Sequence, residues 1–239
     1  MESKSDLRIS GIGKSQGGSY SHVRTDGMAK IKGDTSCISL DSNGTMSIEG
    51  ALQSESVTVN GTATVEGHVN TNRMVLDGMA TLKEQVVCTE LLTVNGGLSV
   101  GRGLIGEKVE IFGNLKTRED VGCEVFSVFG GFSIDGLLNA GLVDIKLNMP
   151  CRVQEIGGDT ITVRRAKKYS VIEQFVPALS ARLHAHTIEG DEVDLEYTDA
   201  EIVRGNNVRI GEGCKIGRVE YKQQLQRDAD AQIGSAHQL

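Results

Sequence analysis

Glycine recurs through the middle of the chain at an almost constant spacing. The intervals between successive glycines of this column are 17, 17, 17, 18, 17 and 17 residues, and its members are Gly27, Gly44, Gly61, Gly78, Gly96, Gly113 and Gly130. A repeat of this length that carries alternating apolar residues is typical of a β-solenoid, in which each repeat is one coil that packs on its neighbours. The period therefore constrains the fold more strongly than any single motif.

Apolar and polar residues alternate within each repeat. The coil that begins at Gly44 places Met46, Ile48 and Leu52 at alternate positions, with polar residues between most of them. Alternation of period two indicates strands, because successive side chains of a strand point to opposite faces. Each repeat holds about three such runs separated by corners. The sequence therefore predicts an all-β fold, a parallel β-helix with about 17 residues per coil over residues 20–163.

The corner before each repeating glycine has its own pattern. Asn43, Asn60, Asp77 and Asn95 occupy it in the earlier coils. Asn–Gly and Asp–Gly pairs favour the positive φ angles of tight turns, so we expect tight turns of that kind at this corner.

Phenylalanine replaces the polar corner residue in two later coils. Phe112 and Phe129 stand there, whereas Phe126 and Phe132 fall at inward positions and are expected in the core. The two corner rings are predicted either to be covered by residues 164–186 or to form an exposed patch for a partner or a second subunit.

The flanking regions depart from the repeat. Residues 1–19 are polar and rich in Gly and Ser, and we predict a disordered N-terminal tail. Residues 164–186 break the alternation and are interpreted as an irregular insertion or hairpin. Further β-helix coils are expected over 187–221, followed by a polar C-terminal tail over 222–239.

The acidic residues within 189–201 are interpreted as solvent faces of strands, or as a docking surface for the basic cluster at 164–168.

Composition agrees with a thin core and a cytoplasmic location. The 239 residues include no Trp, four Tyr and five Phe, whereas a β-helix interior is filled by aliphatic ladders. A net charge of −7 argues against nonspecific nucleic-acid binding. No run of 18 apolar residues is present, and the first six residues lack the apolar region of a signal peptide.

The candidates for chemistry are weak. Cys37, Cys88 and Cys123 share one column of small residues and are interpreted as packing residues in a reducing compartment. His184 and His186 lie on one face of a predicted strand, but two ligands do not make a metal site.

Residues 101–106 match the dinucleotide-binding glycine pattern. The residues that follow, 109–111, read as the next strand rather than as the helix that this pattern requires. We therefore expect no catalytic residue, metal or cofactor.

The repeat Gly-x-[Ala/Met]-x-[Ile/Val]-x-Gly-x-[Leu/Val] runs through roughly residues 20–147 and resembles that of the bactofilins, a family of bacterial cytoskeletal proteins. The resemblance implies a right-handed, three-sided β-helix that polymerises end to end without nucleotide. Members of the family support cell shape, envelope morphogenesis, motility or chromosome organisation. This chain has a longer C-terminal extension than many members, and it lacks the apolar and basic start with which some members touch a membrane.

The ends of a β-coil expose unpaired backbone groups and the cross-section of the core, which recruit another edge. We therefore predict a non-enzymatic cytoskeletal scaffold whose main partner is itself. Related scaffolds or envelope and motility proteins are further expected partners, nucleic acid is not, and membrane association stays open. The predicted contact residues are Ile31, Ile38, Leu40, Phe112, Phe129, Val208, Ile210, Ile216 and Val219. A β-helical adaptor that does not polymerise and a β-helical enzyme are the alternatives.

Overall fold

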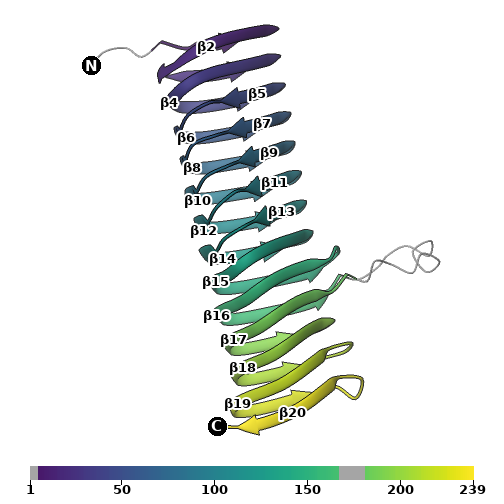
Figure 1. The fold of residues 1–239 in the computed structure, drawn as a ribbon. Helices are drawn as coiled ribbons and strands as arrows, with labels where there is room; N and C mark the ends of the chain where they lie inside the picture. The colour runs from purple at the N-terminus through teal and green to yellow at the C-terminus, as the bar shows by residue number, and fades with distance from the viewer. Residues whose placement is uncertain (1–4, 167–180) are drawn as a thin grey trace, which may run out of the picture. The chain divides into compact units, whose positions relative to one another are not determined.

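The computed structural model describes residues 5–166 and 181–239, and all regular structure among them is β-strand (Figure 1). The strand pairs run parallel, as a solenoid requires. The all-β, β-solenoid prediction is therefore confirmed. The chain divides into two units, Met1–Glu119 and Asp120–Leu239.

In the first unit, strands pair with the strand about 17 residues ahead, so that β5 pairs with β7 and β6 with β8. Its strands are β1 (Leu7–Ile9), β2 (Ile12–Ser19), β3 (His22–Thr25), β4 (Met28–Ser42), β5 (Thr45–Ile48), β6 (Leu52–Val59), β7 (Thr62–Val65), β8 (Val69–Leu76), β9 (Met79–Leu82), β10 (Val86–Val94), β11 (Gly97–Val100), β12 (Leu104–Ile111) and β13 (Asn114–Thr117).

The core of this unit consists of ladders of equivalent residues. Ile31 pairs in register with Ile48, which pairs with Val65, which pairs with Leu82. All four side chains are buried, at 3% exposure or less. Each buried aliphatic side chain of this size contributes about 1.5–3 kcal/mol. The ladder therefore joins the coils both by backbone hydrogen bonds and by apolar contact.

The repeating glycines of the first unit are required by space and not by φ. A Cβ atom on Gly44 or Gly61 would lie 2.0 Å from the carbonyl oxygen of the preceding glycine in the column. The positive-φ glycines among the described residues are Gly11, Gly18, Gly33 and Gly213, and none of them is one of the seven repeating glycines; Gly11 alone of these stands at the same corner, in the coil before Gly27. The prediction of positive-φ turns at this corner is therefore wrong, because close stacking of successive backbones explains the glycines instead.

The polar residues at the same corner form a ladder of their own. The Asn43 side-chain amide donates to Asp26 Oδ1 at 2.7 Å, and that of Asn60 donates to Asn43 Oδ1 at 2.7 Å. Asn95 donates in the same way to Asp77 at 2.6 Å. These side chains therefore link one coil to the next.

The second unit continues the same plan with longer strands. They are β14 (Val121–Val128), β15 (Gly131–Leu147), β16 (Cys151–Arg165), β17 (Leu183–Leu195), β18 (Thr198–Ile210), β19 (Lys215–Arg227) and β20 (Gln232–Gln238). Paired residues are 15 apart between β17 and β18, as in Val193 and Val208, but 32 apart between β16 and β17, as in Ile161 and Val193. The additional residues between β16 and β17 leave the ladder in register.

The predicted boundaries need three corrections. Residues 7–9 and 12–19 form β1 and β2, so most of the N-terminal tail that was predicted to be disordered is structured. These polar residues are ordered because β1 pairs with β3 and β2 pairs with β4. Residues 215–227 and 232–238 form β19 and β20, so the predicted polar tail contains strands. Arg164 and Arg165 end β16 and residues 183–186 begin β17; the part of the predicted insertion between 167 and 180 lies outside the described residues.

We predict that Gly61→Ala lowers the free energy of unfolding by about 1–3 kcal/mol, because the added methyl group has no room beside the Gly44 carbonyl. Gly122→Ala is the control, since a Cβ atom there meets nothing within 4 Å, and its effect should stay within about 0.5 kcal/mol. Denaturant unfolding followed by circular dichroism measures both. Equal stability of the two variants would contradict the stacking argument.

Candidate functional site

Most of the residues predicted as end contacts lie inside the core. Ile31, Leu40, Val208, Ile210, Ile216 and Val219 are 0–3% exposed. Ile31 pairs with Ser15 of β2 on one side and with Ile48 of β5 on the other, so an earlier coil covers it. Val208 likewise lies between Val193 and Leu225. These residues support the coils and cannot themselves touch a partner in the folded chain.

Two sets of strands form the edges of the described coils. At one edge, β1 and β2 pair with β3 and β4, and at the other β20 pairs with β19; within the described residues neither edge has a strand on its outer side. The inward positions of these strands are less apolar than the core. Gly13 and Ser15 of β2 and Ile233 of β20 are half-buried. The sequence prediction missed these edges because β2 and β20 are polar and short of aliphatic residues, and β1 has only three residues.

The remaining predicted contacts are exposed. Ile38 is 45% exposed, Phe112 53% and Phe129 44%. Phe126 and Phe132 are buried and meet edge to face with their ring centroids 5.6 Å apart, which confirms their assignment to the core. In the first unit, the corner position of Phe112 holds Asn or Asp in earlier coils. The ring of Phe112 is exposed where those coils carry a polar side chain, so it offers an apolar contact at this corner.

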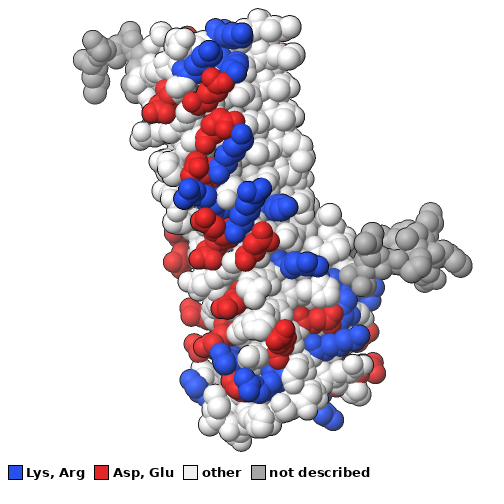
Figure 2. Space-filling view, viewed as in Figure 1, with Lys and Arg blue, Asp and Glu red and all other residues white. Residues whose placement is uncertain are grey.

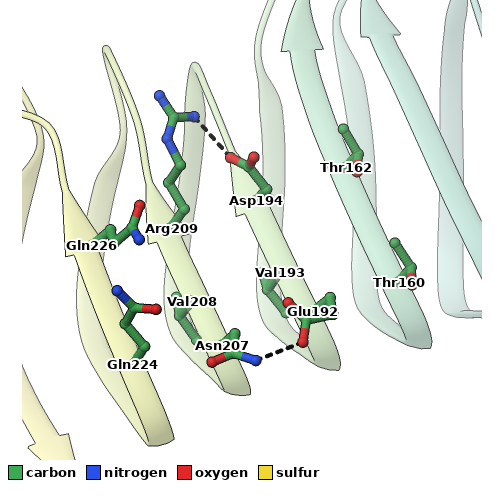
Figure 3. Close-up of a pocket in the computed structure, with 10 residues that line it drawn as sticks. All are labelled: Thr160, Thr162, Glu192, Val193, Asp194, Asn207, Val208, Arg209, Gln224 and Gln226. Carbon is green, nitrogen blue, oxygen red and sulfur yellow. Dashed lines mark hydrogen bonds and ion pairs between the residues drawn. The ribbon is translucent and has the colours of Figure 1, made fainter.

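A polar groove lies on one outer side of the second unit (Figure 3). Its side chains come from equivalent positions of β16, β17, β18 and β19 in register, so it extends across four coils. Glu192 accepts a hydrogen bond from the Asn207 amide at 2.6 Å, and Asp194 accepts one from Arg209 at 2.9 Å. The groove is lined by Thr160, Thr162, Glu192, Val193, Asp194, Asn207, Val208, Arg209, Gln224 and Gln226.

Asp194, which lines this groove, is the centre of an ionic cluster. Arg164 donates to both of its carboxylate oxygens, and Arg209 donates to Oδ1. Partial burial alone would raise the pKa of Asp194, but the hydrogen bonds from the two arginines outweigh it and the pKa is lowered. The sequence-based alternative, in which the acidic stretch docks against the basic cluster, therefore holds for Arg164.

Arginines make contacts just before and just after the connection between β16 and β17. Arg165 stacks over the Tyr197 ring, with its guanidinium carbon 4.5 Å from the ring centroid. Arg182 donates to Asp199 and to the carbonyl oxygen of Gly213. These contacts hold the end of one strand and the approach to the next, which explains how the ladder stays in register across the longer connection.

The cysteines occupy packing positions, and four of the five are buried. Burial raises the pKa of Cys88 to about 11 and those of Cys123 and Cys151 to about 12. Cys37 is buried and its thiol lies 3.5 Å from Ser54 Oγ in the same column. The thiolate is the nucleophilic form, so Cys88, Cys123 and Cys151 are poor nucleophiles at neutral pH.

The other motifs occupy ordinary strand positions. Residues 104–111 form β12, as expected for the glycine pattern at 101–106. His184 and His186 point toward acidic residues of the next strand, at 3.4 Å from Asp199 and 3.1 Å from Glu201. Within residues 5–166 and 181–239, no three His, Cys, Asp or Glu side chains are grouped to hold a metal ion. The same residues include no helix long and apolar enough to cross a membrane.

Two curated proteins of Bacillus subtilis (strain 168) are similar to part of this chain. It is 44% identical to the uncharacterized protein YhbF over 99 residues, which is 41% of this chain and 40% of that protein. It is 37% identical to the uncharacterized protein YhbE over 107 residues, 44% of each. The matches thus span less than half of these relatives. No family model matches the sequence, and no solved structure does.

We predict that the cysteines of the folded chain resist a thiol reagent at pH 8 and that all five react in denaturant. Raised pKa values also make these thiols a source of alkaline instability. The unfolded thiols ionise near 9, whereas the folded pKa is about 11 for Cys88 and about 12 for Cys123 and Cys151. The contribution of these three thiols to stability is therefore full below pH 9 and is lost as the pH rises through the folded pKa values. Rapid labelling of a thiol in the folded chain would contradict this interpretation.

Asp194→Asn should lower the free energy of unfolding by about 1–3 kcal/mol, because Arg164 and Arg209 lose a charged acceptor. The pKa of Asp194 is lowered by folding, so its contribution is present above about 3.8 and is lost as the pH falls through the folded value. Thermal unfolding between pH 3 and 7 measures both effects. Asp191→Asn, at an exposed acid that accepts a hydrogen bond from Asn206, is the control and should change little.

Proposed function

We propose that this chain is a non-enzymatic scaffold that self-assembles through the edges of its β-coils. The observation that supports this most directly is the pair of parallel-strand edges, β1 with β2 and β20, which have no outer partner among the described residues. Their backbone N–H and C=O groups form a ready template for another strand. A second copy of the chain offers the matching geometry, because its coils are also built of parallel strands, which lie about 4.8 Å apart.

The low aliphatic content of the edge strands β2 and β20 fits reversible contact. Gly13 and Ser15 stand where later coils carry Ala29 and Ile31. An edge with small and polar inward residues exposes less apolar surface to water than an edge of core residues would. We propose that backbone pairing holds such a contact, with Ile233 supplying apolar contact at the β20 edge.

The finer function follows the resemblance to the bactofilins. We propose nucleotide-independent filaments in the cytoplasm that support cell shape, envelope morphogenesis or motility, with related scaffolds or envelope proteins as further partners. The repeat that carries the resemblance lies on coils whose strands pair in regular register from β4 to β9, and the register shifts once in β10, between Cys88 and Leu91. This scaffold needs no cofactor or catalytic group.

Electron microscopy of the purified chain without nucleotide should show filaments or sheets. Ile233→Lys should abolish growth, because it places a charge at a half-buried inward position of the edge strand β20. Gln232→Lys changes the neighbouring exposed residue of the same strand and should assemble normally. Circular dichroism verifies that both variants keep the β-sheet signal. A persistent monomer across protein and salt concentrations would refute the proposal, and it is the result that a non-polymerising adaptor would give.

A further inference from the structure

One outer side of the first unit carries no charged residue over four successive coils. We name it the neutral strip and define it by the outward residues of β5, β7, β9 and β11. They are Thr45, Ser47, Thr62, Thr64, Met79, Thr81, Gly97 and Ser99. Figure 2 shows this uncharged flank beside a stripe of acidic and basic side chains.

The charges of the unit begin at the borders of the neutral strip. Lys30 and Lys116 stand in register at its two ends, next to Ser47 and Ser99. Along one side, the corner holds ion pairs between neighbouring coils, Lys83 with Glu66 at 2.7 Å and Arg102 with Glu84 at 2.8 Å. Charge is thus absent from the strip although it is frequent beside it.

The strands of the neutral strip pair regularly and leave no free sheet edge. Thr62 pairs in register with Thr45 and Met79, and Met79 with Gly97, without a bulge. The strands of the strip have partners on both sides, so a ligand can contact only side chains there. Met79 is 60% exposed and leans over Gly97, where a Cβ atom would lie 2.6 Å from its terminal methyl. Hydroxyls, methyl groups and a thioether therefore make up the contact surface.

We propose that the neutral strip is a lateral contact between two copies of this chain. Each copy carries a net charge of −7, and in a contact between identical surfaces like charges face one another. The strip is a surface on which two copies approach without placing charged side chains together. Depletion of charge and enrichment of Met are features of interface centres.

The neutral strip is small, and its area limits the strength of the contact between two chains. Four coils span about 15–20 Å at strand spacing, so the strip covers less than the roughly 800 Å² per partner of a standard interface. A single pair of chains therefore associates weakly. Along a polymer the same contact repeats, and multivalency strengthens it without new contacts. This consequence rests on the proposed self-assembly, whereas the contact itself does not.

Cysteine cross-linking tests the contact directly. Thr64→Cys places a thiol on the neutral strip, and Thr58→Cys places one at a half-buried outward position of β6, on another side of the coil. Under mild oxidation of concentrated protein, Thr64→Cys should give roughly tenfold more disulfide-linked dimer than Thr58→Cys or the unchanged chain. Equal yields from the two variants, or a higher yield from Thr58→Cys, would overturn the proposal.

A charged variant separates lateral from end-to-end contact. Thr64→Lys should leave filament length unchanged and remove paired or bundled filaments in electron micrographs, whereas Thr58→Lys should retain them. Bundles that persist in Thr64→Lys would refute the lateral contact and leave the proposed scaffold standing. If the chain forms no filaments, the proposed scaffold fails, and the dimer yield of Thr64→Cys still decides whether the neutral strip binds a second copy.

Discussion

Close stacking of one backbone turn on the next is the constraint on which the structure of both units depends. In the first unit the carbonyl oxygen of each column glycine occupies the space where a Cβ atom of the next would lie, 1.9–2.0 Å away. Parallel strands lie about 4.8 Å apart, and at this corner the stacked backbones leave no room for a side chain at the glycine position. The glycine column, the aliphatic ladders and the amide ladder all follow from this stacking.

Much of the fold could be predicted from the sequence because the period and the alternation are independent signals. The 17-residue spacing indicated the coil, and the alternation placed Ile48 and Val65 in one ladder. The mistake about φ at the corner has a physical cause, since Asn–Gly favours both a tight turn and a close approach and a single sequence does not distinguish them. Only the neighbouring coil reveals which one applies.

The edges and the contact residues could not be predicted in the same way. An inward position filled by Ser15 or Gly13 gives no apolar signal, so the coils at the edges resembled tails. Ile31 and Leu40 were placed at an end for that reason, although β2 and β3 cover them. The acid-rich stretch gave a clearer signal: its alternation indicated strands, and its charge suggested docking against the basic cluster at 164–168, of which Arg164 contacts Asp194.

The longer connection between β16 and β17 shows where this architecture tolerates new sequence. The register changes from a spacing of 32 residues to one of 15 in the next coil, and the inward ladder of Ile161, Val193 and Val208 is unbroken. Because each coil packs only on its neighbours, an added segment at a corner alters no ladder beyond it. Corners of this kind are natural grafting points: a foreign epitope or a fluorescent domain placed there would be displayed at a defined coil without rebuilding the core.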